Sequence, residues 1–444
     1  MKTIEVKTKK GWIRGEDKGM CKIFRSIAYA KSPSGALRWK RPQETDAWDG
    51  IYDATLFKTR CPQRLPQEYA PPEDLYNKEF YNNYDFIPAR GEDSLHLNIW
   101  TPDCSPEHPY PVAFWIHGGG FGGGFGFEKE FDGEAYCERG VILVTINYRL
   151  GIFGFLPHPW LCEEDAMGLC GNYGIFDQIA ALNWVYENIG SFGGDPENIT
   201  IFGQSAGGAS VRALVSSDLT GTKIKKAIVQ SGIFSLGDRD CSRLQDVMKY
   251  GIEFVESTGV SSLADLRKMP WEELINIYWD YCLKDPKMRM GWCHPIADGY
   301  LLKDTLANLQ ADGKIKDIPY MVGSNADDLV FEPETLESSK DSFQKACICW
   351  CEQREDMGSC PSYLYHFSRK LPGSSDGAFH SAELWYTFGT LSRCWRPMEA
   401  HDYALSRQML DYWADFIKYG DPNGEKETIW KPYKKEQPFI EEFR

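Results

Sequence analysis

Apolar residues follow two different spacings along the chain, and segments of the two kinds alternate. One kind is a short, mostly apolar run, which is typical of a strand buried on both faces of a parallel sheet. The other kind has apolar residues three and four positions apart, as at Ile179, Leu182 and Val185, and predicts an amphipathic helix over 176–189. The strand-like runs lie at 111–117, 141–147, 198–203, 226–230 and 318–323. The alternation predicts an α/β fold with a mostly parallel central sheet flanked by helices.

Three segments differ from this alternation. Residues 1–15 alternate apolar and polar positions and predict a first strand. Residues 65–87 are rich in proline, acidic and aromatic residues, and we expect a loop at the mouth of a pocket there. Residues 234–292 have helical spacing and lie between strand-like runs, which predicts an inserted helical cap. No linker interrupts the pattern, so residues 1–444 are expected to form a single domain.

Composition and charge argue against some classes of binding partner. The formal net charge is −15, which argues against nucleic acid or an anionic membrane surface as a partner. No stretch approaches the roughly 18 apolar residues of a membrane span, and no N-terminal apolar run has signal-peptide length. The 14 cysteines are scattered and indicate no disulfide framework. A cytoplasmic location is therefore the expectation.

A candidate nucleophile lies in the pattern Gly-Gln-Ser-Ala-Gly at 203–207. This pattern matches the G-x-S-x-G turn, in which a serine is exposed between a strand and a helix. A chain with 41 glycines can contain it by chance, so the context carries the argument. A strand-like run precedes the motif and a start of small residues typical of a helix follows it. The motif in this context predicts that Ser205 is a catalytic nucleophile.

A serine nucleophile needs a histidine base, which follows the acid in this type of fold. Three histidines follow the last strand-like run of the core. His366 lies in an alternating, strand-like segment, and His401 lies near the start of a predicted helix over 403–417. His380 lies in an irregular, glycine-containing segment, the kind of loop that presents catalytic side chains. His380 is therefore the predicted base.

Two neighbouring aspartates are candidates for the acid that orients the base. Asp327 and Asp328 follow the run at 318–323, at the strand end where sites in parallel sheets form. Their chemistry alone does not separate them.

A glycine-rich segment supplies candidate oxyanion donors. His117 to Phe121 contains three consecutive glycines after a strand-like run. A phosphate-binding loop would need a lysine followed by serine or threonine, which is absent from the sequence here. The predicted donors are the backbone amides of Gly119 and Gly120, with that of Ala206 after the nucleophile.

These motifs, taken together, resemble the type-B carboxylesterase and cholinesterase family. The resemblance rests on the nucleophile signature and on several further stretches: 192–207, 92–99, 147–151, 171–178, 230–232, 420–423 and 430–433. It implies the α/β-hydrolase fold and a serine carboxylesterase, with no cofactor and no metal. The family places its acid second in an Asp-Glu-Gly triplet, which favours Asp328 within Asp327-Asp328-Leu329, and its histidine segment matches 377–383.

The chain departs from the family at a disulfide position. Ser94 stands where secreted members carry a cysteine, so the resemblance implies that Cys61 lacks its partner. A metal site is not expected at the cysteine cluster either, because its spacing lacks the paired C-x-x-C arms of zinc sites. That cluster consists of Cys347, Cys349, Cys351 and Cys360.

The predicted reaction is ester hydrolysis through an acyl-enzyme, with Ser205, His380 and Asp328 as the triad. The expected partner is a small-molecule ester. Aromatic residues of the mouth segment and cap suggest apolar or aromatic esters: Tyr76, Tyr81, Trp279, Tyr281 and Trp292. Two alternatives stay open: a non-catalytic binding protein of the same fold, and the same machinery acting on amides or thioesters.

Overall fold

Twelve strands of the described chain pair into one mixed sheet. The structure is a computed structural model, and it describes residues 1–444 except 234–240, 285–291, 330–341 and 426–428. The strand order is β1-β2-β3-β5-β7-β6-β8-β9-β12-β13-β14, with β4 beside β2. The strands are β1 Thr3–Lys7, β2 Trp12–Asp17, β3 Lys22–Ala28, β4 Ile51–Asp53, β5 His96–Thr101, β6 Tyr110–Ile116, β7 Ile142–Ile146, β8 Gly194–Gln204, β9 Ile224–Gln230, β12 Tyr320–Asn325, β13 Ser362–Phe367 and β14 Glu441–Phe443.

Along this order the strands pair antiparallel from β1 to β7 and parallel from β7 to β14, and β4 pairs parallel with β2. All five predicted runs are strands (β6, β7, β8, β9 and β12), which confirms the mostly parallel sheet. The single strand predicted over residues 1–15 is wrong, because the chain turns back there. The backbone amide of Thr8 donates to the carbonyl of Gly11, and β1 pairs antiparallel with β2.

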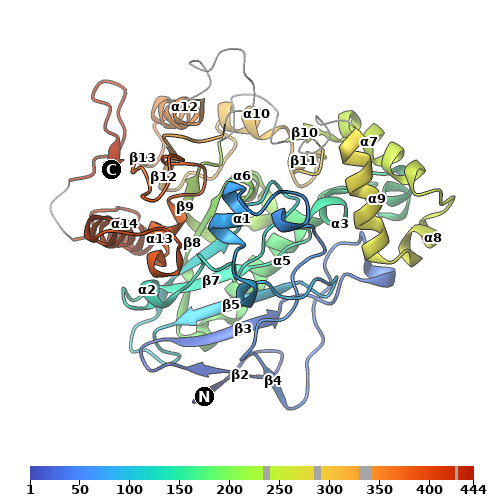
Figure 1. The fold of residues 1–444 in the computed structure, drawn as a ribbon, viewed down its shortest axis with the longest axis horizontal. Helices are drawn as coiled ribbons and strands as arrows, with labels where there is room; N and C mark the ends of the chain where they lie inside the picture. The colour runs from blue at the N-terminus through green and yellow to red at the C-terminus, as the bar shows by residue number, and fades with distance from the viewer. Residues whose placement is uncertain (234–240, 285–291, 330–341, 426–428) are drawn as a thin grey trace.

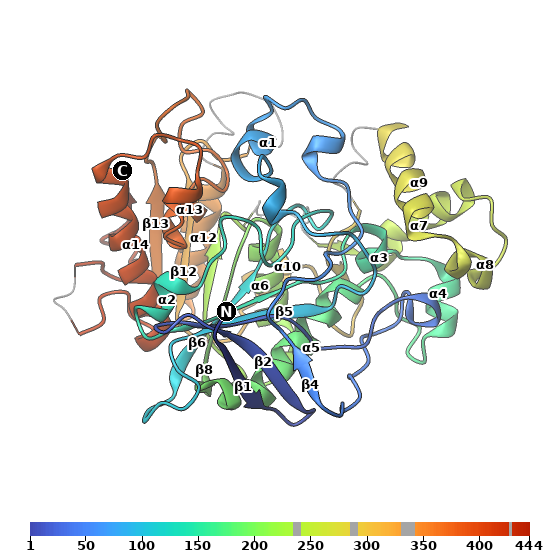
Figure 2. The same cartoon turned by 60° about the horizontal axis from the view of Figure 1, so that its bottom comes forward.

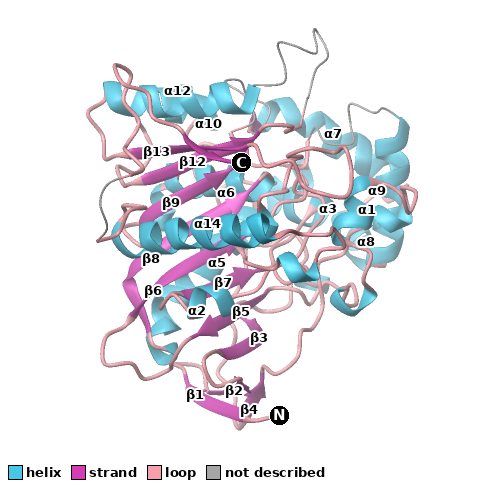
Figure 3. Ribbon diagram, turned by 60° about the vertical axis from the view of Figure 1, so that its left-hand side comes forward, coloured by secondary structure: helices cyan, strands magenta, loops and turns pink. Residues whose placement is uncertain are grey.

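Helices cover both faces of the parallel part of the sheet, as Figure 3 shows. Consecutive residues of β6 belong to two different clusters of buried side chains: Phe114 and Ile116 to one, Ala113 and Trp115 to the other. Successive side chains of a strand point to opposite faces. Both faces of β6 are therefore buried, which explains why its sequence is apolar at consecutive positions.

The helices divide between those two clusters. Buried residues of α5 and α6 pack in the first cluster, and those of α13 and α14 pack in the second. The helices are α1 Leu75–Phe80, α2 Glu134–Cys137, α3 Gly151–Phe155, α4 Pro159–Glu164, α5 Tyr173–Asn188, α6 Ala206–Ser216, α7 Leu244–Ser257, α8 Leu263–Lys268, α9 Trp271–Lys284, α10 Leu306–Ala311, α12 Ser342–Asp356, α13 Leu384–Thr387 and α14 Ala400–Tyr419.

The predicted cap corresponds to α7, α8 and α9, which lie between β9 and β12 in sequence. The three helices gather at one side of the molecule, away from α14 (Figure 1). A two-stranded sheet, β10 (Ser242–Arg243) with β11 (Ile296–Ala297), closes the ends of this insertion. Residues 234–240 and 285–291 of the predicted cap lie outside the described residues.

The segment 65–87 is more ordered than the loop that its composition predicts. It contains the helix α1 and two short 3-10 turns, Pro66–Glu68 and Tyr84–Phe86. Asp74 starts α1 by accepting hydrogen bonds from the backbone amides of Tyr76 and Asn77. In Figure 2, α1 lies between the cap helix α9 and the C-terminal helices α13 and α14.

Among the described helices, none combines the length and the apolar character that a membrane crossing requires.

Candidate active site

Ser205 lies in the tight turn between β8 and α6, with φ 56° and ψ −126°. A positive φ is costly for a residue with a side chain, and such strain is common where a nucleophile is presented. The turn also needs small neighbours. A Cβ atom on Gly207 would lie 2.0 Å from the carbonyl oxygen of Ile116 in β6. The glycine at the end of the motif therefore has a steric cause in this chain, since any larger residue at 207 would collide with the adjacent strand.

The glycine-rich segment after β6 lies against this turn. A Cβ atom on Gly118 would be 3.1 Å from the Cβ atom of Ser205. The next residues form a compact turn in which the carbonyl of Gly119 accepts from the amides of Gly122 and Gly123, at 3.1 and 2.9 Å. A Cβ atom built on Gly120 would have no neighbouring heavy atom within 4 Å, so the space beside this residue is open. The fold thus brings the predicted oxyanion segment to the predicted nucleophile.

The His380 ring is hydrogen-bonded to Asp328 through Nδ1 and Oδ1. Both side chains are almost fully buried. Two further donors hold the other carboxylate oxygen of Asp328: the hydroxyl of Ser231 at 2.7 Å and the backbone amide of Asn325 at 3.1 Å. The carboxylate is therefore fixed from both sides and orients the ring.

Asp327 has a different set of neighbours. Its Oδ2 accepts from the backbone amide of Ala378 at 2.8 Å, and its own amide donates to the carbonyl of Ala378 at 3.1 Å. It also forms an isolated parallel bridge with Phe379. The structure thus separates the two aspartates that the sequence chemistry left open. Asp328 contacts the ring of His380, and Asp327 holds the loop that carries it.

The second ring nitrogen of His380 points toward the nucleophile turn. Its Nε2 lies 3.2 Å from the side-chain Nε2 of Gln204, the residue before Ser205. With Nδ1 facing Asp328, a neutral ring has its lone pair on Nε2 and accepts from the amide of Gln204. The proton-accepting nitrogen thus contacts the residue that precedes Ser205 in the turn.

A second buried carboxylate, Glu383, lies behind the site and was missed by the sequence reasoning. It accepts from the side-chain amides of Asn325 at 2.6 Å and of Gln230 at 3.4 Å. Burial raises the pKa of Glu383 to about 7. Both Glu383 and Ser231 lie within the family-like stretches 377–383 and 230–232, which is the signal that could have found them.

The mouth segment reaches the site through α1. The hydroxyl of Tyr76 donates to the backbone carbonyl of His380 at 3.4 Å. Three of the other aromatic residues predicted at the mouth and cap are hydrogen-bonded or buried within the protein instead. Tyr81 donates to Glu128, Tyr281 donates to Glu253, and Trp292 is fully buried. Trp279 of the cap packs against Tyr69 of the mouth segment, with ring centroids 4.7 Å apart.

The other histidine candidates lie elsewhere. His366 is in β13 and pairs with Glu442 at 3.2 Å, and His401 is in the first turn of α14 with its Nε2 2.8 Å from the carbonyl oxygen of Arg444. The cysteine cluster is spread over α12 and the turn after it. Cys347 and Cys351 are buried, whereas Cys349 and Cys360 are partly exposed. Within the described part of the chain, no three His, Cys, Asp or Glu side chains gather as metal ligands would.

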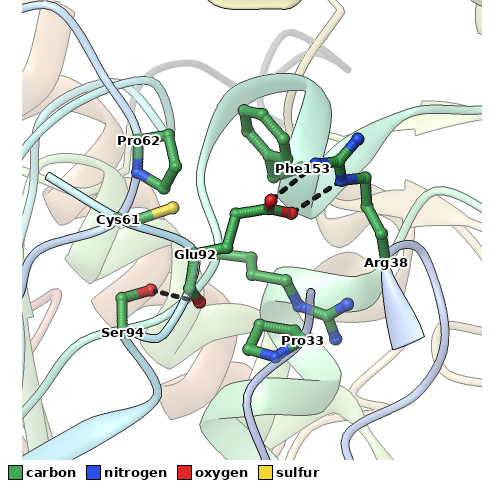
Figure 4. A pocket seen from close by; sticks show the side chains of 8 residues that line it. Pro33, Arg38, Cys61, Pro62, Glu92, Ser94 and Phe153 are labelled. Carbon is green, nitrogen blue, oxygen red and sulfur yellow. Dashed lines mark hydrogen bonds and ion pairs between the residues drawn. The ribbon is translucent and has the colours of Figure 1, made fainter. Parts of the chain in front are cut away.

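Figure 4 shows the neighbourhood of Cys61 and Ser94, beside the ion pair of Arg38 with Glu92. The sulfur of Cys61 accepts from the backbone amide of Leu150 at 3.3 Å. Burial raises the pKa of the Cys61 thiol to about 12, so it stays protonated at neutral pH. Cys61 is thus a free buried thiol with a serine at the position of the family's second cysteine.

Comparison with known proteins identifies the family of the chain. The profile of the carboxylesterase family matches residues 2–346 and 332–442. The fumonisin B1 esterase of Sphingopyxis macrogoltabida is 35% identical over 72% of this chain, a stretch that spans 55% of that protein. The para-nitrobenzyl esterase of Bacillus subtilis (strain 168) is 30% identical over 97% of this chain and 93% of its own length. A solved PNB esterase superposes with a TM-score of 0.85 at 28% identity, covering 99% of this chain and 95% of that one.

The fold and the matches define the class of protein as the α/β-hydrolases that cleave carboxylic esters. The chain belongs to the carboxylesterase family, and it is a carboxylic ester hydrolase.

Proposed function

We propose that the chain hydrolyses esters through a triad of Ser205, His380 and Asp328 and through an acyl-enzyme intermediate. The single observation that carries this proposal is the buried His380–Asp328 hydrogen bond, with the other ring nitrogen directed to the residue before Ser205. A histidine held by a buried carboxylate on one side and directed to a serine turn on the other can act as a general base.

In the first half-reaction, the Ser205 hydroxyl attacks the ester carbonyl while His380 Nε2 takes its proton. The imidazolium that forms is stabilised by Asp328. The backbone amides of Gly119, Gly120 and Ala206 donate to the oxyanion, each contributing roughly 3 kcal/mol of transition-state stabilisation. His380 then protonates the leaving alcohol, and an acyl-enzyme remains on Ser205.

In the second half-reaction, water replaces the alcohol. His380 takes a proton from the water as it attacks the acyl carbonyl, and the same amides hold the second oxyanion. Return of the proton to the Ser205 oxygen releases the carboxylic acid and restores the free enzyme. The cycle requires neither a cofactor nor a metal ion in its chemical steps.

The substrates that we propose are small to medium esters with apolar or aromatic groups. Two aromatic contacts support this choice: Tyr76 at the carbonyl of His380, and Trp279 packed on Tyr69 between the cap and the mouth segment. The similarity to a para-nitrobenzyl esterase also favours an aromatic leaving group. Rates on a series of nitrophenyl esters of increasing acyl length, beside matched amides and thioesters, would define the preference.

The first experiment compares the wild type with Ser205→Ala on para-nitrophenyl acetate. Loss of the nucleophile is expected to lower kcat by on the order of 10⁵-fold or more, because no acyl-enzyme can form. Ser216→Ala, at the end of the same helix, is the matched control and should keep wild-type rates. Equal rates for the wild type and Ser205→Ala would refute the proposal, and an inactive wild type would favour a binding protein of the same fold.

A further inference from the structure

Two cysteines that are distant in sequence lie together beside the antiparallel edge of the sheet. Cys21 precedes β3 and Cys137 ends α2, a sequence separation of 116 residues. Their sulfur atoms are 2.9 Å apart, about 0.9 Å more than the length of a disulfide bond. Both side chains are buried, with 4% and 5% of their surface exposed. The two sulfur atoms are thus already close to bonding distance.

We propose that Cys21 and Cys137 are a redox modification site, which closes to a disulfide when the protein meets a low-molecular-weight disulfide as oxidant. The proposal rests on the geometry of these thiols and is independent of the esterase mechanism. In the reducing compartment that we propose for this chain, the pair is reduced at rest.

A second contact holds the two thiols together. Lys18, in the turn before β3, forms an ion pair of 2.8 Å with Glu134 in the first turn of α2. The backbone amide of the same lysine donates to the carbonyl of Cys21 at 3.0 Å. The turn that carries Cys21 is thus attached to the helix that carries Cys137 by a contact other than the thiols.

The reaction balances as two exchange steps. The thiolate of Cys21 attacks one sulfur of the small disulfide, whose S–S bond breaks and releases one thiolate. Cys137 then loses its proton to solvent and attacks the sulfur of Cys21, which expels the second small thiolate. The two protein thiols lose two electrons and two protons in total, and the small disulfide is reduced to two thiols.

The order of these steps follows from the hydrogen bond between the thiols. That bond, with burial, raises the pKa of Cys137, so this residue keeps its proton and reacts second. Cys104 is a nearby competitor, because it is partly exposed and interacts electrostatically with Cys21. Burial raises its pKa to about 12, which disfavours its thiolate as the attacking group.

The cross-link would join separate layers of the fold. It would attach the turn before β3 to α2, and the hydroxyl of Tyr136 in α2 donates to the carbonyl of Thr387 in α13 at 2.9 Å. It would also close a loop of more than 100 residues, which restricts the unfolded chain strongly. The expected effect is a higher melting midpoint, by about 5 °C, in the oxidised protein.

The test uses the full chain treated with oxidised glutathione at pH 8. After free thiols are alkylated, a non-reducing digest is expected to contain the Cys21 and Cys137 peptides joined, lighter than their sum by two hydrogen atoms. The melting midpoint should fall on addition of dithiothreitol. In Cys137→Ser, the joined peptide and the dithiothreitol effect should both be absent, whereas Cys349→Ser, at a partly exposed thiol of α12, should keep both.

Two results would overturn the proposal. One is complete alkylation of Cys21 and Cys137 in the wild type after oxidation. The other is a joined peptide that links Cys21 to Cys104 instead. The peptide map of the wild type decides between these outcomes even where a variant fails to fold. Esterase rates measured on the same samples report separately on the proposed triad.

Discussion

Asp327 and Asp328 are adjacent in sequence, yet their carboxylates have different hydrogen-bond partners. Asp328 binds the ring of His380, and Asp327 binds the backbone of Ala378 two residues before it. Successive residues after a strand direct their side chains differently, so a shift of one position along the chain changes which carboxylate contacts the base.

Substitution by asparagine distinguishes these roles. Asp328→Asn is expected to lower kcat by on the order of 10³–10⁴-fold, since an amide neither fixes the productive tautomer nor stabilises the imidazolium. Asp327→Asn keeps an oxygen that can accept from Ala378 and should cost less than about tenfold. Steady-state rates on para-nitrophenyl acetate measure both. A larger loss for Asp327→Asn would reverse the assignment.

Glu383 makes the stability of the folded protein depend on pH. Its pKa is about 7 in the folded protein because it is buried, against 4.5 for the unperturbed group. The folded state therefore holds a proton that the unfolded chain releases above about pH 4.5. This contribution to stability is fully present below pH 4.5 and is lost as the pH rises through 7, by up to about 3 kcal/mol.

Glu383→Gln cannot ionise and does not undergo this loss. The melting midpoint of the variant, relative to the wild type, is therefore expected to increase between pH 5 and pH 8. Thermal melts at several pH values measure the difference. A difference that stays constant with pH would show that Glu383 titrates alike in the folded and unfolded chain.

At the scale of elements, α1 is held in place by one buried carboxylate. Glu79 accepts from the guanidinium of Arg396 at 2.9 Å and from the indole N–H groups of Trp385 and Trp395 at 2.9 and 2.8 Å. Arg396 also pairs with Asp376 at 3.0 Å, in the loop before His380. The mouth helix, α13 and the histidine loop thus share one polar network.

Glu79→Ala is expected to destabilise the protein by about 3–5 kcal/mol, because the buried Arg396 would keep only one carboxylate partner, Asp376, which is partly exposed. The esterase rate should fall as well, since Tyr76 of the same helix contacts His380. Glu73→Ala, exposed in the same segment, is the control and should change neither quantity. Melting midpoints and kcat measure the two effects, and an unchanged midpoint for Glu79→Ala would contradict the anchoring role.

At the scale of the whole molecule, Arg38 joins the cap to the core. Its guanidinium pairs with Glu92 at 2.5 Å and donates to the carbonyls of Arg267 and Met269 at 3.1 and 2.8 Å. These carbonyls belong to the C-terminal end of α8, where helix carbonyls lack partners within the helix. One planar side chain thus satisfies both the core carboxylate and the cap.

Arg38→Lys keeps the charge and loses the planar fork, so it cannot serve all of these acceptors. The amides of α8 are expected to exchange hydrogen faster in this variant, whereas those of β6 should be unchanged. Arg14→Lys, at a half-exposed pair with Glu5, is the matched control and should match the wild type. Equal exchange of α8 in all three proteins would show that other contacts hold the cap.

The parts of the fold that follow from local backbone preference could be predicted from the sequence. The strands β6 to β9 and β12 are continuous apolar runs because both of their faces are buried. The turn at Ser205 is encoded by small residues that a strained turn next to β6 requires. These features depend on residues within a few positions of one another, and periodicity reports them directly.

Tertiary structure decided the contacts between residues that are distant in sequence. The antiparallel turn after β1, the docking of α1 at His380, the burial of Glu383 and the meeting of Cys21 with Cys137 depend on how layers pack. Asp328 and His380 are 52 residues apart in sequence, so only the direction of the aspartate side chain in the folded protein decides which carboxylate contacts the ring. The sequence by itself thus determined the five apolar strands of the parallel sheet, the helical character of the cap and the identity of the serine turn. Packing determined which side chains meet, because distance along the chain carries no information about direction in space.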